Sequence, residues 1–224
     1  MEPAPPAAAP SWPVVGVGLL IALGLPQWGL GNRLAPGEGL GAVLGRELVW
    51  WAVAGLLLLY VRRVERLPLS SVGIRRPTRG TLGYGLLLTV VLMASVMFSF
   101  AVLFPLLGLK LNQSAVAQIT RLPFGVRCLL FLRAAVVEEI LYRGYPIERL
   151  EKRTGSTALA FVVSVGVFTY VHLAGWGGAQ LIVVGFGAVI LAGWYVWRRD
   201  LLSNMLAHFL VDLIGFVLAS AQTR

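Results

Sequence analysis

The chain alternates long apolar runs with short polar or basic connections. The apolar runs cover residues 13–30, 48–61, 81–104, about 123–147, 157–173, 181–197 and 201–219. An α-helix needs roughly 20 mostly apolar residues to cross a bilayer, and most of these runs approach or reach that length. The pattern therefore predicts an all-α fold, a polytopic transmembrane bundle of about seven helices.

The overall composition supports a membrane protein. The 224 residues are 58% hydrophobic and 13% charged, whereas a soluble domain is usually about 25% charged. The net charge of +9 comes largely from arginines at the ends of apolar runs, which suits lipid headgroups better than nucleic acid. We therefore expect membrane lipids as partners and no nucleic acid. Cys128 is the single cysteine, so no internal disulfide can form.

Three regions are expected along the chain. Residues 1–12, MEPAPPAAAPSW, form a Pro/Ala-rich leader that we expect to be disordered, and it lacks the basic start of a signal peptide. Residues 13–122 hold the N-terminal transmembrane helices and a basic loop. Residues 123–220 form a core of four helices that carries the chemistry.

The basic loops predict the orientation in the membrane. Arginines and lysines concentrate in the loops after the second, fourth and sixth runs, for example at Arg62, Arg63, Arg149 and Arg198. The positive-inside rule places these loops and the N-terminus in the cytoplasm. The Ala-, Gly- and Arg-rich composition hints at a bacterial inner membrane.

A few acidic residues and both histidines lie inside the apolar runs, all of them in the last four. They are Glu138, Glu139, His172, His208 and Asp212. Such residues are costly in a membrane and mark functional sites. The alternatives are an ordinary ion pair at a helix end and histidines that are merely satisfied in the core. The clustering of both histidines with the intramembrane acids favours a site.

The two adjacent acids have different surroundings on an α-helix. Glu139 and Arg143 stand at i and i+4, so they can pair on one face. Glu138 lies about 100° around the helix and has no such partner in its own turn. Glu139 is therefore expected to be neutralised locally, while Glu138 is left for chemistry.

Counting along the next hairpin brings Glu138 to the level of His172. The turn at Gly155 is 17 residues from each of them (155 − 138 and 172 − 155). A carboxylate and a histidine that meet can hold and deprotonate a water molecule, and His208 can stabilise the charge that develops on a carbonyl oxygen. These groups are sufficient to hydrolyse an amide without a covalent nucleophile.

Three motifs in order resemble a known signature. They are Glu138-Glu139-x-x-x-Arg143, Phe168-x-x-x-His172 and His208-x-x-x-Asp212. Together they resemble the CAAX protease and bacteriocin-processing family, which includes the Ras-converting CAAX endopeptidases and bacterial Abi-type proteins. The resemblance covers roughly residues 126–215. It implies an intramembrane endopeptidase without a cofactor, whose substrate is a membrane-associated protein or peptide that is lipidated or carries a C-terminal sorting tail.

The resemblance also implies a role for each motif residue. Glu138 matches the general base and His172 the residue that positions the attacking water. His208 and Asp212 match the oxyanion side of the site. An ionised Asp212 cannot donate a hydrogen bond to an oxyanion, so it must be protonated or must orient His208. The remaining motif residues match supporting positions, namely Glu139, Arg143 and Phe168.

Two other readings stay open. Zinc could be held by Glu138, His172, His208 and Asp212, although the chain has no HExxH motif. A non-enzymatic immunity or proton-relay protein could use the same intramembrane groups. A serine mechanism is disfavoured, because neither Ser164 nor Ser203 lies in a Gly-x-Ser-x-Gly turn.

Overall fold

The structure, a computed structural model, describes residues 10–222 and contains no strand in that range. Within it, the helices long and apolar enough to cross a membrane are Leu40–Arg63, Arg79–Leu106, Thr157–Trp176, Leu181–Arg198 and Leu201–Leu218. A shorter apolar helix covers Trp12–Gln27. The expected all-α, polytopic bundle is confirmed, and most of the expected leader, residues 1–9, lies outside the described residues.

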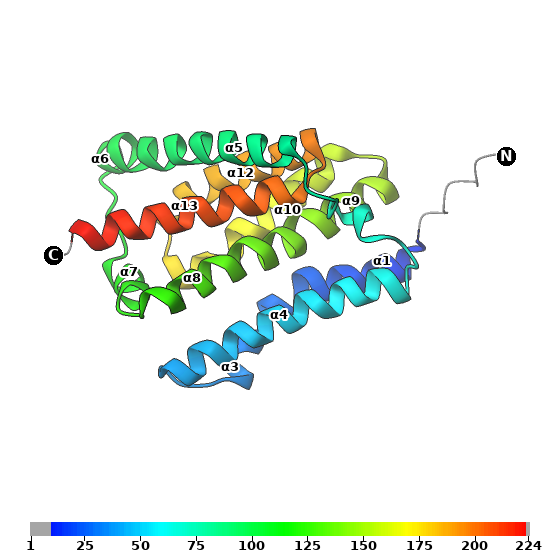
Figure 1. The fold of residues 1–224 in the computed structure, drawn as a ribbon, viewed down its shortest axis with the longest axis horizontal. Coiled ribbons are helices and arrows are strands. Elements are labelled where there is room, and N and C mark those ends of the chain that lie inside the picture. The colour runs from blue at the N-terminus through cyan, green and yellow to red at the C-terminus, as the bar shows by residue number, and fades with distance from the viewer. Residues whose placement is uncertain (1–9, 223–224) are drawn as a thin grey trace.

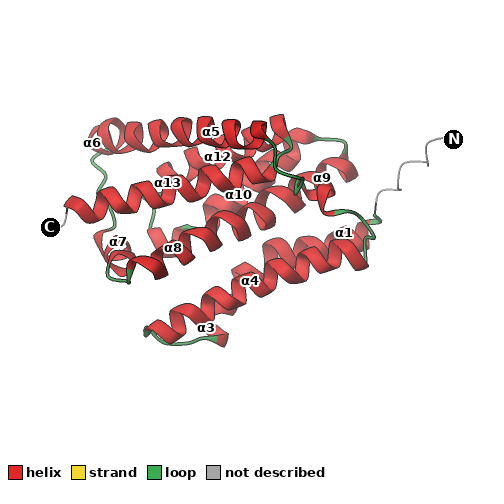
Figure 2. Ribbon diagram, viewed as in Figure 1, coloured by secondary structure: helices red, strands yellow, loops and turns green. Residues whose placement is uncertain are grey.

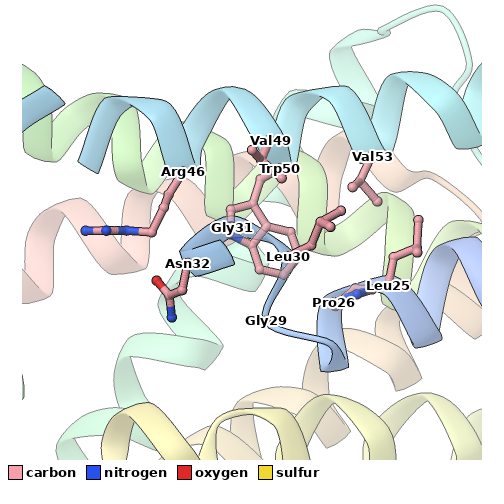
Figure 3. Close-up of a pocket in the computed structure, with 10 residues that line it drawn as sticks. All are labelled: Leu25, Pro26, Gly29, Leu30, Gly31, Asn32, Arg46, Val49, Trp50 and Val53. Carbon is pink, nitrogen blue, oxygen red and sulfur yellow. The ribbon is translucent and has the colours of Figure 1, made fainter. Parts of the chain in front are cut away.

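The N-terminal part is a helical hairpin. Its elements are α1 (Trp12–Leu19), the π-helical turn η1 (Leu20–Gly24), α2 (Leu25–Gln27), α3 (Leu30–Leu34) and the long α4 (Leu40–Arg63). The blue and cyan helices lie side by side in Figure 1. The Tyr60 hydroxyl of α4 donates a hydrogen bond to the Val14 carbonyl of α1 at 2.7 Å. The turn at Gly29 packs on α4 around a pocket of about 170 Å³, drawn in Figure 3.

The remaining elements form the main bundle, and Figure 2 shows them as helices joined by short loops. In chain order they are η2 (Leu69–Val72, a 3₁₀ turn), α5 (Arg79–Phe98), η3 (Ser99–Leu103, π-helical), α6 (Phe104–Leu106), α7 (Gln113–Thr120), α8 (Phe124–Arg133), η4 (Ala134–Gly144, π-helical), α9 (Tyr145–Thr154), α10 (Thr157–Val171), α11 (Leu173–Trp176), α12 (Leu181–Arg198) and α13 (Leu201–Gln222). Helix α13 runs through the middle of the bundle and packs against both α5 and η4.

Local sequence signals explain where these helices begin and end. Thr78 and Thr81 form a reciprocal capping box at the start of α5. Ser156 accepts a hydrogen bond from the Leu159 amide at the start of α10, as expected for an N-cap. Gly155 ends α9 with φ 71°, a left-handed conformation that glycine adopts without strain.

Glycine allows close approach of α5 and α13. A Cβ atom at Gly85 would lie 2.8 Å from Leu206 Cδ2 and 3.2 Å from the Ser203 carbonyl oxygen. Small residues at such crossings are typical of helices packed in membranes, where association depends on van der Waals contact. This contact fixes the position of α13, and with it His208.

Ion pairs tie the helices together at the end of the bundle that holds α9. Arg149 pairs with Glu65 at 2.7 Å, both side chains are buried, and Arg149 also donates to the Ser71 carbonyl. Arg199 pairs with Glu148 and Glu151. Partial burial disfavours the ionised form of Glu151, but hydrogen bonds from the Thr157 hydroxyl and from Arg199 outweigh it and hold the pKa of Glu151 below its usual value. 

Candidate active site

The adjacent acids lie on a π-helical segment, η4, that continues directly from α8 and into α9. A π-helix forms i→i+5 hydrogen bonds, is rare, and occurs frequently at functional sites. This geometry places Arg133, the last residue of α8, beside Glu138, with Nη1 2.8 Å from Oε1. Glu138 therefore does have a guanidinium partner, five residues earlier in the chain, which the i and i+4 spacing of an α-helix did not predict.

Glu138 and His172 face each other, as the hairpin count predicts. Glu138 Oε2 lies 3.9 Å from His172 Nε2, and the two side chains are 14% and 18% exposed. The other ring nitrogen, His172 Nδ1, lies 2.7 Å from the Phe168 carbonyl oxygen. Since a carbonyl only accepts, Nδ1 carries the proton in this contact, which leaves Nε2 available towards Glu138.

Glu139 is fully buried and is the centre of a polar network. Its Oε1 accepts from Arg143 Nη1 at 3.0 Å, as expected, and also lies 3.0 Å from His208 Nδ1. Its Oε2 accepts from Asn204 Nδ2 at 3.2 Å. The Arg143 guanidinium carbon lies 3.8 Å from the centre of the Phe168 ring, which is a cation–π contact. Because Arg143 Nε and Nη2 are buried without a hydrogen-bond partner among the described residues, this contact with the ring helps to stabilise the buried charge.

The polar residues of α13 share one helical face. Asn204, His208 and Asp212 are spaced four residues apart, and all three point into the site. His208 Nε2 lies 3.7 Å from Asp212 Oδ2, which is an ion-pair distance rather than a hydrogen bond. Asn204 was missed in the sequence although its spacing from His208 could have revealed it.

A cavity of about 380 Å³ opens beside these groups. Glu138, His172, His208 and Asp212 all lie on its wall, so the structure brings the four expected catalytic residues together. The rest of the wall is mostly apolar and comes mainly from α5, η3, α7, α8, α10, α11, α12 and α13, with Leu92, Val96, Phe100, Val116, Ile119, Leu130, Phe131 and Phe216 among its residues. Ligand pockets are typically about 300–1,000 Å³ and mostly apolar with a few polar groups, so this cavity fits that description.

The cavity is bounded by a break between α10 and α12. Gly177 adopts φ 79° after α11, so the chain turns instead of continuing as a helix. Asn112, just before α7, donates through its side-chain Nδ2 to the Trp176 carbonyl at 3.2 Å. Its backbone N–H donates to Gln180 Oε1 at 3.4 Å. These bonds attach α7 to the broken segment.

The two serines of the core have structural contacts. The Ser164 hydroxyl donates to the Tyr142 carbonyl at 2.6 Å, and the Ser203 hydroxyl donates to the Asp200 carbonyl at 2.8 Å. Both residues are fully buried, and neither is among the described residues that line the cavity.

Among the described residues, the acidic and histidine side chains of the site do not gather as a set of metal ligands. Within residues 10–222, no group of three or more His, Cys, Asp and Glu side chains converges as a set of metal ligands. A cation at Glu138 would in addition lie close to the Arg133 guanidinium, which would repel it. A reaction without a metal stays a prediction, tested below.

The fold and the site define an integral membrane protein with an acid–histidine site between its helices. Residues 120–214 match the family described as type II CAAX prenyl endopeptidase Rce1-like, and this region contains all four residues proposed as catalytic. The resemblance drawn from the three motifs is thereby confirmed, and the match supports a CAAX-type intramembrane protease in general terms. No match is found among curated proteins or among solved structures.

Proposed function

We propose that the chain hydrolyses a peptide bond with a water molecule activated by Glu138 and His172. The observation that carries this proposal is the 3.9 Å separation of Glu138 Oε2 and His172 Nε2 at the wall of an apolar cavity. At this separation, one water molecule can contact both groups. The surrounding apolar walls limit competing water and strengthen the electrostatic interactions inside.

The reaction needs no covalent intermediate with the protein. Glu138 takes a proton from the water molecule while the water oxygen attacks the carbonyl carbon of the substrate. The π electrons of that carbonyl group move to the carbonyl oxygen. The C–N bond then breaks, and the leaving nitrogen receives the proton from Glu138. The products are a carboxylic acid and an amine, and Glu138 returns to its starting form.

His208 is placed to stabilise the oxyanion. Its Nδ1 faces Glu139, whose carboxylate accepts a hydrogen bond from Nδ1–H, so Nε2 is the nitrogen on the cavity side. A protonated imidazole can donate Nε2–H to the developing oxyanion. Asp212, whose Oδ2 lies 3.7 Å from Nε2, orients that imidazole, a role that an ionised carboxylate can fulfil.

The substrate that fits this cavity is a membrane-associated peptide with an apolar attachment. Most of the wall consists of aliphatic and aromatic side chains, which suit a lipid chain or an apolar C-terminal tail better than a polar peptide. The orientation proposed from the basic loops places the N-terminus in the cytoplasm of a bacterial cell.

Cleavage of defined peptides tests the proposal. Purified protein in lipid nanodiscs is incubated with an internally quenched CAAX peptide whose cysteine carries a farnesyl group, with the same peptide unmodified, and with a peptide that ends in an apolar tail. Cleavage of either apolar peptide, lost in Glu138→Gln, supports the proposal. Membrane proteomes from cells with wild-type and Glu138→Gln protein identify natural substrates, and equal turnover by both proteins would refute the mechanism.

A further inference from the structure

Arg133 lies between two carboxylates that come from distant parts of the chain. Its Nε is 2.8 Å from Glu47 Oε2 and its Nη2 is 3.4 Å from Glu47 Oε1, while Nη1 contacts Glu138 Oε1 at 2.8 Å. The guanidinium carbon also lies 5.6 Å from the centre of the Trp50 ring. Both Glu47 and Trp50 belong to α4, so this helix holds the guanidinium from two sides (Trp50 is drawn in Figure 3).

The two contacts with Glu47 fix the plane of the guanidinium. A guanidinium has N–H groups in a rigid fork, so a carboxylate that accepts two of them sets the direction of the others. Here the remaining contact is made by Nη1 with Glu138 Oε1. The second oxygen, Glu138 Oε2, is left facing His172.

We propose that Glu47 is a positioning residue for hydrolysis. By occupying two N–H groups of Arg133, it prevents Arg133 from taking both oxygens of Glu138 in a bidentate pair. Glu138 Oε2 thereby stays turned towards the attacking water. This inference rests on the proposed role of Glu138 as general base, and it adds a residue from outside the region that matches the CAAX protease family.

The location of Glu47 separates its effect from substrate binding. Among the described residues, those that line the cavity include Arg133 and Glu138 but not Glu47. A change at Glu47 therefore reaches the reaction only through Arg133. We expect such a change to lower kcat and to leave KM nearly unaltered.

The test compares Glu47→Gln with two controls that remove a carboxylate elsewhere. Glu38→Gln removes an exposed charge just before α4, and Glu65→Gln breaks the buried pair with Arg149 at the other end of α4. With the farnesylated peptide in nanodiscs, and rates expressed per folded molecule, Glu47→Gln should lose roughly 5–50-fold in kcat with KM within about twofold. Glu38→Gln should be unchanged, and Glu65→Gln should melt at a lower temperature with unchanged kcat.

A double-mutant cycle tests whether Glu47 acts through Arg133. Arg133→Lys keeps the charge but lacks the fork, and it is expected to lower kcat by itself. In this background, Glu47→Gln should cause less than about a twofold further loss, because the two residues act in series. Equal losses in both backgrounds, or a kcat within about twofold of wild type for Glu47→Gln alone, would overturn the inference.

An infrared measurement reads the same arrangement without a substrate. The carboxylate band of Glu138 is assigned as the band that disappears in Glu138→Gln. In Glu47→Gln this band should shift as Arg133 moves to a bidentate contact, and an unmoved band would count against the role of Glu47. If Glu138→Gln instead retains turnover, the proposed function fails, whatever the band shows for Glu47.

Discussion

His208 Nδ1 lies 3.0 Å from Glu139 Oε1, so the second histidine is attached to the acid that also binds Arg143. The sequence predicts that Glu138 is the catalytic acid and that Glu139 is a structural one. In the structure, Glu139 contacts His208, the residue proposed to stabilise the oxyanion. Glu139 is therefore expected to serve two purposes, the stability of the bundle and the orientation of His208.

Changes at the two residues proposed to activate water should abolish cleavage without unfolding the protein. Glu138→Gln removes the proton acceptor and His172→Ala removes the group that orients the water, in a cavity that can accommodate the change. General-base catalysis typically contributes about 10²–10⁴-fold, so turnover of the farnesylated peptide should fall at least that far. The melting temperature in detergent should stay close to that of the wild type, and wild-type turnover in Glu138→Gln contradicts the assignment.

Removing the buried acid should instead affect stability first. Glu139→Ala leaves the fully buried Arg143 without its carboxylate, and breaking such a pair can cost about 3–5 kcal/mol. For a chain of this size the melting temperature should fall by roughly 6–20 °C. Glu38→Gln is the matched control, because that carboxylate is exposed. Unchanged melting with lost activity would place Glu139 in the reaction alone.

Asp212 distinguishes the water-activating mechanism from a zinc enzyme. If Asp212 orients His208, an amide at the same position supplies a similar polar group, so Asp212→Asn should keep a substantial part of the activity and Asp212→Ala should lose most of it. If Asp212 binds a metal, losing its charge weakens that binding. In that case the Asn variant is inactive, and a chelator inhibits the wild type. Elemental analysis of both proteins, with turnover measured with and without the chelator, gives the answer.

The packing of α5 on α13 can be tested with two glycines on one helix. A methyl group at Gly85 would collide with Leu206, whereas one at Gly83 would meet nothing within 4 Å. Gly85→Ala should therefore destabilise the protein by about 1–3 kcal/mol. Gly83→Ala should be neutral or stabilising by up to about 1 kcal/mol, because alanine favours the helix. Similar melting temperatures for the two variants would show that this contact is loose.

The parts of the site that follow from counting residues were predictable. Straight helices joined by a known turn place Glu138 opposite His172, and the structure finds them 3.9 Å apart. Hydropathy likewise located the long helices, since apolar composition follows directly from the bilayer. The pairing of Glu139 with Arg143 needed only their spacing.

Contacts that depend on tertiary packing could not be predicted in this way. Glu47 reaches Arg133 across 86 residues, and it lies just before the apolar run expected to start at residue 48, whereas α4 starts at Leu40. The contact of Arg133 with Glu138 depends on a π-helical segment, and no simple periodicity of side chains in the sequence predicts such a segment. The contacts of Arg133 with Glu47 and with Glu138 belong to the surroundings of the proposed base, Glu138, and do not change which residue is proposed as the base.

The π-helical segment also makes the length of this part of the chain critical. Arg133 and Glu138 face each other only at their present separation along the chain, and inserting one residue within 134–137 turns α8 by roughly a quarter of a turn relative to Glu138. Arg133 would then leave the carboxylate, although every side chain in the site would still be present. Natural variants and engineered proteins should accept substitutions along 134–137 far more readily than a single insertion there.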